Sequence, residues 1–297
     1  MSDNNTLKGV LLVGLGAASY GLLATFVKLA YAAGYTTAEV TASQMALGIL
    51  GVAIIRFFQK DKTAQVVQAT GKNILHLLVA GTSIGFTSVF YYLAVKFVPV
   101  SVGIVLLMQS VWMGVLAEWL ITKQVPVPKK ILAVLVVLAG TVLATNLLEA
   151  DSIPDLRGIA WGLLAAVSYT VTMFAGNRIA VNLPAAQRSL YMLFGGAVVV
   201  MVFTAITWPG TFNFEIFYTW GIPLALFGTL LPPLLMNAGF PKVSMGLGSI
   251  VSAIELPVSV AMAYIVLGER VSGTQWLGIA LILSAIVLMN ISRKRKA

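Results

Sequence analysis

Ten apolar runs of about twenty residues each occupy almost all of the 297-residue sequence. Charged residues, proline or glycine bound each run. A helix that crosses a bilayer needs about 20 predominantly apolar residues, and its backbone groups must be hydrogen-bonded within the segment. The runs lie near residues 8–29, 37–58, 73–96, 99–122, 127–147, 158–179, 187–208, 219–239, 244–266 and 272–291. The sequence therefore predicts an all-α integral membrane protein with ten transmembrane helices.

The chain has too few charged residues to cover a soluble domain, since they make up 10% of it against 59% hydrophobic residues. Its net charge of +9 comes from basic residues scattered through short loops, without the basic face that nucleic-acid binding needs. Cysteine is absent, and His76 is the single histidine. We therefore expect no metal site, no cofactor, no nucleic-acid partner and no enzymatic activity, although an integral-membrane enzyme stays a remote alternative.

The basic residues predict the orientation of the chain in the membrane. With both termini in the cytoplasm, the outer loops hold only Lys28, Lys96, Arg157 and Arg270 of the 19 Lys and Arg residues. The inner positions hold the rest: Lys8, Arg56, Lys60, Lys62, Lys72, Lys123, Lys129, Lys130, Arg178, Arg188, Lys242, Arg293, Lys294, Arg295 and Lys296. Cytoplasmic loops carry an excess of Lys and Arg. We expect a multi-pass protein of the bacterial inner membrane with both termini cytoplasmic.

The two halves of the sequence resemble each other. Ser19-Tyr20 aligns with Ser168-Tyr169 at an offset of 149, and Gly81-Thr82 aligns with Gly228-Thr229 at an offset of 147. We place the halves at residues 1–148 and 157–297, joined by an acidic linker. Five helices are an odd number, so the second half must enter the membrane from the opposite side. Two inverted five-helix repeats are an architecture that supports alternating access to a central site.

The end of the second half carries the clearest motif. Glu255-Leu256-Pro257 is followed by Leu267-Gly268-Glu269-Arg270, a last helix from Trp276 and a basic tail. With the duplicated ten-helix plan, these residues resemble the EamA family of the drug/metabolite transporter superfamily. The first half departs from the motif, with Gln109-Ser110-Val111 and Lys123-Gln124 in the matching places. The resemblance implies a secondary transporter that exports amino acids or related metabolites.

Glu255 is the leading candidate for a functional residue, because a carboxylate near the bilayer centre is costly and rare. Gly248, Ser252, Glu255 and Ser259 share one helical stripe, which predicts a polar face turned into the bundle. Glu255 would bind a substrate ammonium or a coupling proton. The alternative is a protonated carboxyl group that joins helices through hydrogen bonds.

Other polar and aromatic residues near span centres are candidates to line the same cavity. We take Gln109 as the counterpart of Glu255, with Trp112 one turn further along. The remaining substrate-binding or proton-coupling candidates are Tyr20, Tyr169, Ser252, Asn237 and Tyr91, and the hinge candidates are Pro232, Pro233 and Pro257. For each of them, ordinary helix packing is the alternative.

These observations predict an inner-membrane exporter of small metabolites, such as amino acids or related amines, by alternating access around a central cavity. Its partners would be a small-molecule substrate, the lipid bilayer and, as an open alternative, protons. Purines, toxic cations and a passive facilitator stay open as alternatives. The sequence does not decide between a monomer and a dimer.

Overall fold

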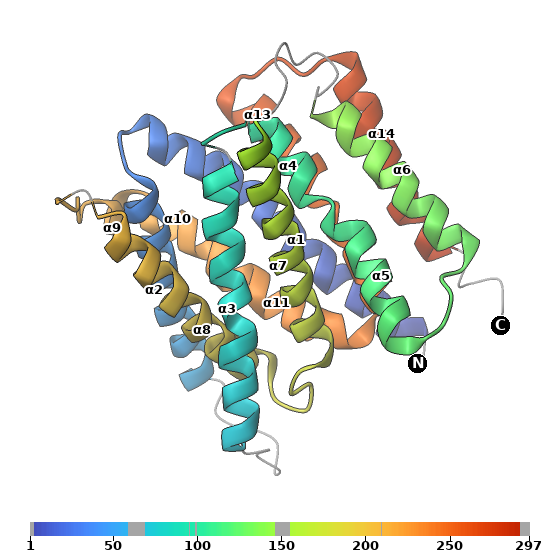
Figure 1. Ribbon diagram of the computed structural model, residues 1–297, viewed down its shortest axis with the longest axis horizontal. Helices are drawn as coiled ribbons and strands as arrows, with labels where there is room; N and C mark the ends of the chain where they lie inside the picture. The colour runs from blue at the N-terminus through green and yellow to red at the C-terminus, as the bar shows by residue number, and fades with distance from the viewer. Residues whose placement is uncertain are drawn as a thin grey trace.

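The computed structural model describes residues 3–58, 69–94, 96–98, 100–145, 155–208 and 210–291, and this part of the chain contains helices and turns without strands. The first half forms α1 (Asp3–Ala32), α2 (Thr37–Phe58), α3 (Gly71–Ala94), α4 (Val100–Leu107), α5 (Ser110–Thr122) and α6 (Pro128–Ala144). The second half forms α7 (Leu156–Arg178), α8 (Ala185–Ile206), α9 (Ile216–Thr219), α10 (Gly221–Ala225), the π-helical turn η2 (Leu226–Leu230), α11 (Leu231–Gly239), the 3-10 turn η3 (Phe240–Lys242), α12 (Met245–Ser252), α13 (Glu255–Leu267) and α14 (Gly273–Ile291). The expected all-helical fold is confirmed (Figure 1). Lys60, Lys62 and the basic tail lie outside the described residues, and so does the acidic linker apart from its last residues, which begin at Asp155.

Eight helical segments of the described chain are long and apolar enough to cross a membrane. The other two predicted spans, 127–147 and 272–291, form α6 and α14, which are shorter in apolar length. They pack against each other along one edge of the molecule (Figure 1). Gly278 lies so close to α6 that a Cβ there would meet the Gly140 carbonyl oxygen at 2.5 Å. α6 and α14 would have to cross the membrane as well to give ten crossings, and this stays a prediction.

The fourth and ninth predicted spans are each broken into a short and a long helix. α4 and α12 have 8 residues each, α5 and α13 have 13 residues each, and both long helices end at a residue with left-handed backbone, Lys123 with φ 58° and Gly268 with φ 67°. All of these boundaries differ by a constant 145 positions. At this offset Ser110, and not Gln109, stands where the second half has Glu255. The pairing of Gln109 with Glu255 was therefore wrong by one residue.

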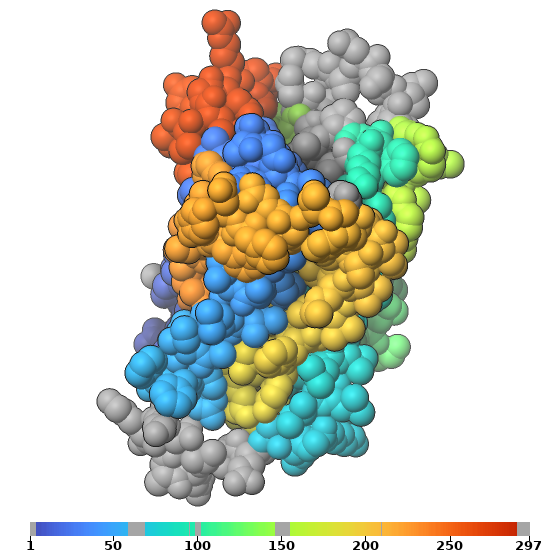
Figure 2. All heavy atoms as spheres, turned by 90° about the vertical axis from the view of Figure 1, so that its left-hand side faces the viewer, coloured from blue at the N-terminus to red at the C-terminus, as the bar shows by residue number. Residues whose placement is uncertain are grey.

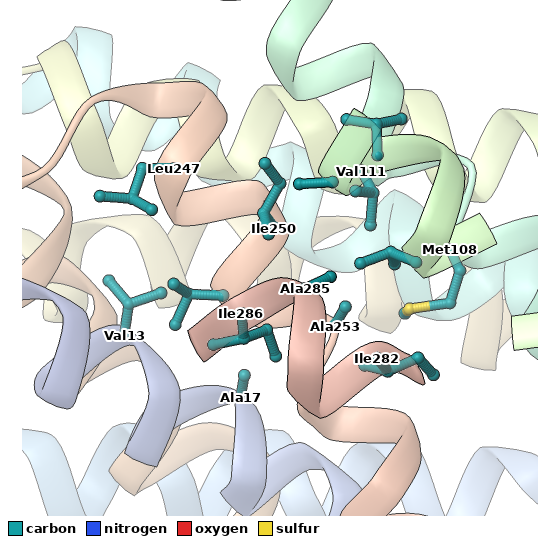
Figure 3. Packing of buried hydrophobic residues seen from close by; sticks show 14 of the residues in the cluster. Val13, Ala17, Met108, Val111, Leu247, Ile250, Ala253, Ile282, Ala285 and Ile286 are labelled. Carbon is teal, nitrogen blue, oxygen red and sulfur yellow. The ribbon is translucent and has the colours of Figure 1, made fainter. Parts of the chain in front are cut away.

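The joints within these broken helices lie in the largest hydrophobic cluster. Met108 and Ala253, one at each joint, are 1% and 0% exposed. Around them pack apolar residues of α1, α5, α12 and α14, including Val13, Ala17, Val111, Leu247, Ile250, Ile282, Ala285 and Ile286 (Figure 3). Since apolar side chains surround the joints, packing holds the ends of the half-helices in place.

Small residues bring α3 and α8 into close contact. A Cβ on Gly81 would collide with the backbone of Met192, and one on Gly85 would lie 2.5 Å from the Gly196 carbonyl oxygen. α2 packs on the other side of α8, and Figure 2 shows this face, with α2 in blue, α8 in yellow and the segment of α9 and α10 in orange above them. The Gly81-xxx-Gly85 spacing serves helix packing, as such spacings do in membrane proteins.

Candidate functional site

A cavity of about 270 Å³ lies in the middle of the bundle. Residues of α1, α2, α3, α4, α7, η2 and α13 line it, so both halves contribute to its wall. The lining runs from Tyr20, Tyr169 and Glu255 in the interior to Lys28 and Leu267, where α1 and α13 finish. The cavity therefore extends toward the end of the bundle opposite to the one where α1 begins.

Glu255 is on the wall of this cavity as the first residue of α13. α1 runs directly against this point, because a Cβ added to Gly21 would lie 2.5 Å from the Glu255 carbonyl oxygen. The carboxylate Oε2 atom of Glu255 is buried and has no hydrogen-bond partner among the described residues. The break before α13 thus leaves a buried, unpartnered carboxylate oxygen on a residue of the cavity wall.

Five tyrosines line the cavity: Tyr20, Tyr31, Tyr91, Tyr92 and Tyr169. Tyr20 and Tyr169, which the internal repeat puts at matching places of α1 and α7, meet edge to face with ring centroids 6.4 Å apart. Tyr91 and Tyr92 form a second edge-to-face pair at 6.2 Å. The wall is therefore aromatic and carries hydroxyl groups at several points.

Four of the eight predicted site residues are brought together on the cavity, namely Glu255, Tyr20, Tyr169 and Tyr91. Ser252 is buried next to them, and its hydroxyl donates to the Gly248 carbonyl oxygen at 2.9 Å inside α12. Asn237 lines a smaller void of about 20 Å³ that shares Tyr20 and Tyr169 with the main cavity. Its side chain donates to the Ser189 hydroxyl at 2.9 Å.

Gln109 and Trp112 are not among the residues that line the cavity, contrary to expectation. The Trp112 indole N–H donates to Gln109 Oε1 at 3.0 Å, and the Gln109 amide donates to the Val105 carbonyl oxygen at 3.0 Å. Trp112 is 37% exposed on the outer surface of the bundle. Because neighbouring helical positions differ by about 100° around the axis, the one-residue error in register is enough to turn both side chains away from the interior.

The predicted hinge prolines lie at helix starts. Pro232 and Pro233 are buried in the first turn of α11, directly after the π-helical turn η2. Pro257 is buried in the first turn of α13. A proline in the first turn of a helix removes a backbone N–H that has no intrahelical partner there, which applies to Pro257. Pro232 and Pro233 lie instead within the continuous helical span Gly221–Lys242, directly after its π-helical turn. Their function as hinges stays a prediction.

Other residues of the site were not among the predicted site residues. Gln44 and Tyr92 are two of them, and both line the cavity. Lys28 lines its outer part and pairs with Glu269 at 2.8 Å. A cavity residue of this kind is recognisable from the sequence only when its helix face is known.

Arg188 lies beyond the small void, as seen from the main cavity. Its side chain is among the fully buried ones, at 1% exposure, and it donates to four carbonyl oxygens rather than to a carboxylate. The acceptors are Ile179 at 3.0 Å, Asn237 at 2.8 Å, Ala175 at 3.2 Å and Gly176 at 2.7 Å. The guanidinium therefore joins the end of α7 to α8 and α11. No sequence pattern marks such a network, because its acceptors are backbone atoms.

Glu118, near the end of α5, is held by two other helices. Its carboxylate pairs with Lys130 at 2.9 Å and accepts the Gly246 backbone N–H at 2.5 Å. The two charged side chains are only 19% and 13% exposed. Glu118 thus connects α5, α6 and the first turn of α12.

The site has the features of a binding cavity and not of a metal centre. Among the described residues, no group of three or more His, Cys, Asp or Glu side chains could hold a metal ion. The cavity wall instead combines aromatic rings, one interior carboxylate and small hydroxyl side chains. Such a mixture of apolar surface and a few convergent polar groups is typical of small-molecule sites.

The comparisons with known proteins agree with this fold. Residues 7–146 and 156–291 each match the model of the EamA-like transporter family. A solved structure titled "Crystal structure of protein" superposes with a TM-score of 0.77, covering 98% of this chain and 99% of the other, at 16% sequence identity, and so supports the fold alone. No curated protein matches the sequence. Because the family model covers both halves, the chain belongs to the EamA-like transporter family and is a multi-pass membrane transporter.

Proposed function

We propose that this protein is a secondary transporter of the bacterial inner membrane that exports small metabolites, such as amino acids or related amines. The observation that carries the proposal is the unpartnered carboxylate of Glu255 on a cavity built from both halves. A buried charged or polar group of this kind is costly unless a ligand, a proton or a partner satisfies it. A transported ammonium group, or a coupled proton, would fill that place.

Alternating access is supported by the difference between the two ends of the bundle. The cavity lining extends to Lys28 and Leu267 at one end. Toward the other end, Tyr20 and Tyr169 separate it from the small void, and the Arg188 network lies beyond. In this conformation the site would be accessible from one side only. With both termini cytoplasmic, as the positive-inside rule predicts, that side is the periplasm.

The orientation proposal needs both termini on one side, and the helix packing supports this. Near the start of α1, Gly9 contacts Lys242 just before α12, and near the end of α14 the Leu288 carbonyl oxygen accepts from Lys129 at 2.6 Å, in α6. Glu118 links these regions through Lys130 and Gly246. The first and last helices thus have their free ends at one end of the bundle (Figure 1).

The test is transport by the purified protein in proteoliposomes. Counterflow of labelled amino acids, amines and nucleobases is measured with and without an imposed pH gradient. We expect saturable movement of one of these classes, and a strong decrease in Glu255→Gln at normal expression. Glu215→Gln makes the same chemical change at an exposed residue and serves as the control. Wild-type rates in Glu255→Gln, or no movement of any solute by folded protein, would contradict the proposal.

The same measurement decides the coupling. If a proton drives export, an imposed pH gradient accelerates movement in the wild type and has no effect in Glu255→Gln. If Glu255 only holds an ammonium group, the gradient has no effect in either protein. Both results are compatible with transport, and they distinguish its energy source.

A further inference from the structure

We propose that the cavity selects organic ammonium ions that carry N–H donors and no carboxylate, in preference to zwitterionic amino acids and anions. This inference rests on the proposed transport function and names the substrate class of the same site. It follows from which polar atoms of the wall are unpaired, and from where the charges of the wall lie.

The unpaired polar atoms are concentrated on this cavity. Five buried side-chain polar atoms of the described residues have no hydrogen-bond partner, and three of them belong to residues on the cavity wall: Gln44 Oε1, Tyr169 Oη and Glu255 Oε2. An amide oxygen can only accept hydrogen bonds, and so can both oxygens of a carboxylate once it is ionised, the form that a bound ammonium group stabilises. The ligand that satisfies them must therefore bring donors, and an ammonium group brings up to three.

Three hydroxyl groups of the wall also act as acceptors toward the cavity. Thr87 donates its proton to the Ser83 carbonyl oxygen at 2.7 Å, and Thr229 donates to the Gln44 carbonyl oxygen at 2.8 Å. Ser88 donates in the same way to Ile84 at 3.3 Å. A hydroxyl has a single proton, so once this is used the oxygen offers only lone pairs. These three oxygens thus add lone pairs to those of Gln44 Oε1 and Glu255 Oε2, while the tyrosine hydroxyls of the wall keep protons of their own.

The charges of the wall favour a cation and offer nothing to a carboxylate. Among the described residues that line the cavity, Lys28 is the one cationic side chain, and Glu269 already holds its ammonium group at 2.8 Å. Lys28 is also eight residues from Tyr20 on α1, which corresponds to about 12 Å along the helix. A 2-amino acid bound at Glu255 would therefore place its own carboxylate near a negative charge, with no cation to compensate it.

The aromatic wall suits the rest of such a ligand. Tyr20, Tyr31, Tyr91, Tyr92 and Tyr169 surround the cavity, and the faces of tyrosine rings attract ammonium groups while they also pack on apolar carbon. A volume of about 270 Å³ is near the lower limit for ligand pockets, about 300 Å³. An amine with a single ring, or with a short alkyl chain, fits this description.

The test compares three solutes with the same ring and different charge: phenethylamine, phenylalanine and 3-phenylpropionate. Each is used as the competitor and as the labelled solute in counterflow with the wild-type protein in proteoliposomes. We expect phenethylamine to move with at least about a tenfold advantage over phenylalanine, and 3-phenylpropionate not to move. Trimethylation of the phenethylamine nitrogen keeps the charge and removes the N–H donors, so we expect it to reduce transport.

The outcomes separate this inference from the proposed function. Equal or faster movement of phenylalanine overturns the preference for ammonium ions and leaves a working transporter. Transport of a nucleobase or another non-cationic solute, with phenethylamine unmoved, has the same meaning. A trimethylated cation that moves as well as phenethylamine overturns the need for N–H donors. If no solute moves, the proposed function itself fails.

Variants test whether the preference for ammonium ions depends on the unpaired polar atoms of the cavity wall. Gln44→Leu removes one unpaired acceptor, and we expect a several-fold higher half-saturation concentration for phenethylamine. Gln124→Leu, at an exposed position after α5, is the matched control and stays at the wild-type value. Tyr169→Phe provides a second test with a smaller risk of misfolding, and it should also raise the half-saturation concentration for phenethylamine. Unchanged half-saturation in both site variants contradicts the inference.

Discussion

The ring of Tyr20 contacts the ring of Tyr169 edge to face, with 6.4 Å between centroids and 82° between planes. The two residues come from equivalent positions of the first helix in each half, and both line the main cavity and the small void. They therefore form a floor between these spaces. The pair also shows that the two halves meet at this point, where the internal repeat brings identical side chains together.

Removal of one ring from this floor should lower stability. We expect Tyr20→Ala to decrease the free energy of unfolding by about 3 kcal/mol, because the void joins the cavity and the edge contact is lost. Tyr20→Phe keeps the ring and should cost less than about 1 kcal/mol. Thermal melting in detergent measures both, with Tyr264→Ala, 52% exposed on the surface, as the control. Equal effects at Tyr20 and Tyr264 would show that the floor is not held by packing.

Arg188 should be more important for stability than its formal charge suggests. We expect Arg188→Lys to cost about 2–4 kcal/mol, since one ammonium cannot reproduce the planar fork that reaches four carbonyl oxygens of α7 and α11. Arg178→Lys makes the same change at an exposed position of α7 and should have little effect. Melting temperatures of the two variants in one detergent provide the comparison. If Arg188→Lys melts at the wild-type temperature, the four carbonyl groups must find other donors.

Because α3 and α8 approach closely, we expect alanine substitution at two glycines of α3 to have very different effects on stability. In Gly81→Ala the new methyl group would overlap the Met192 backbone, and we expect a loss of about 1–3 kcal/mol as the helices separate. Gly71→Ala, where nothing lies within 4 Å of the added atom, should be neutral or slightly stabilising. Folded yield and melting temperature report the difference. Similar values for both variants would argue against direct contact of the two backbones.

The sequence was sufficient to predict the all-helical membrane fold and part of the site. Apolar length predicts the helices because a bilayer imposes one dimension on all of them. The repeat places Tyr20 and Tyr169 at matching positions, and the cost of a buried carboxylate points to Glu255. All three line the cavity in the structure. These features were accessible because each depends on residue type and spacing alone.

The rest of the site depends on geometry that the sequence does not carry. Gln109 and Trp112 were misplaced because the offset between the halves falls from 147 at Gly81 and Gly228 to 145 along α4 and α5, and this change becomes visible only from the helix boundaries. Arg188 bonds to backbone carbonyl groups, which every residue has, so its partners leave no signature in the sequence. The acceptor atoms of the cavity wall leave no signature in the sequence either, because they depend on the group to which each hydroxyl donates its proton.

Glu118 gives the last prediction, because its partner in the structure is not the lysine that is nearest to it along the chain. Lys123 is nearer along the chain, while the structure pairs Glu118 with Lys130 at 2.9 Å and with the Gly246 N–H at the start of α12. A negative charge at a helix N-terminus is favourable, and the low exposure of the pair reduces screening by water. We expect a double-mutant cycle of Glu118→Gln with Lys130→Gln to give a coupling energy of about 0.5–2 kcal/mol in SDS-titrated unfolding. The parallel cycle with Lys123→Gln should give a coupling near zero. If the larger coupling belongs to Lys123 instead, Glu118 points out to solvent, and the connection between α5, α6 and α12 must be carried by apolar packing alone.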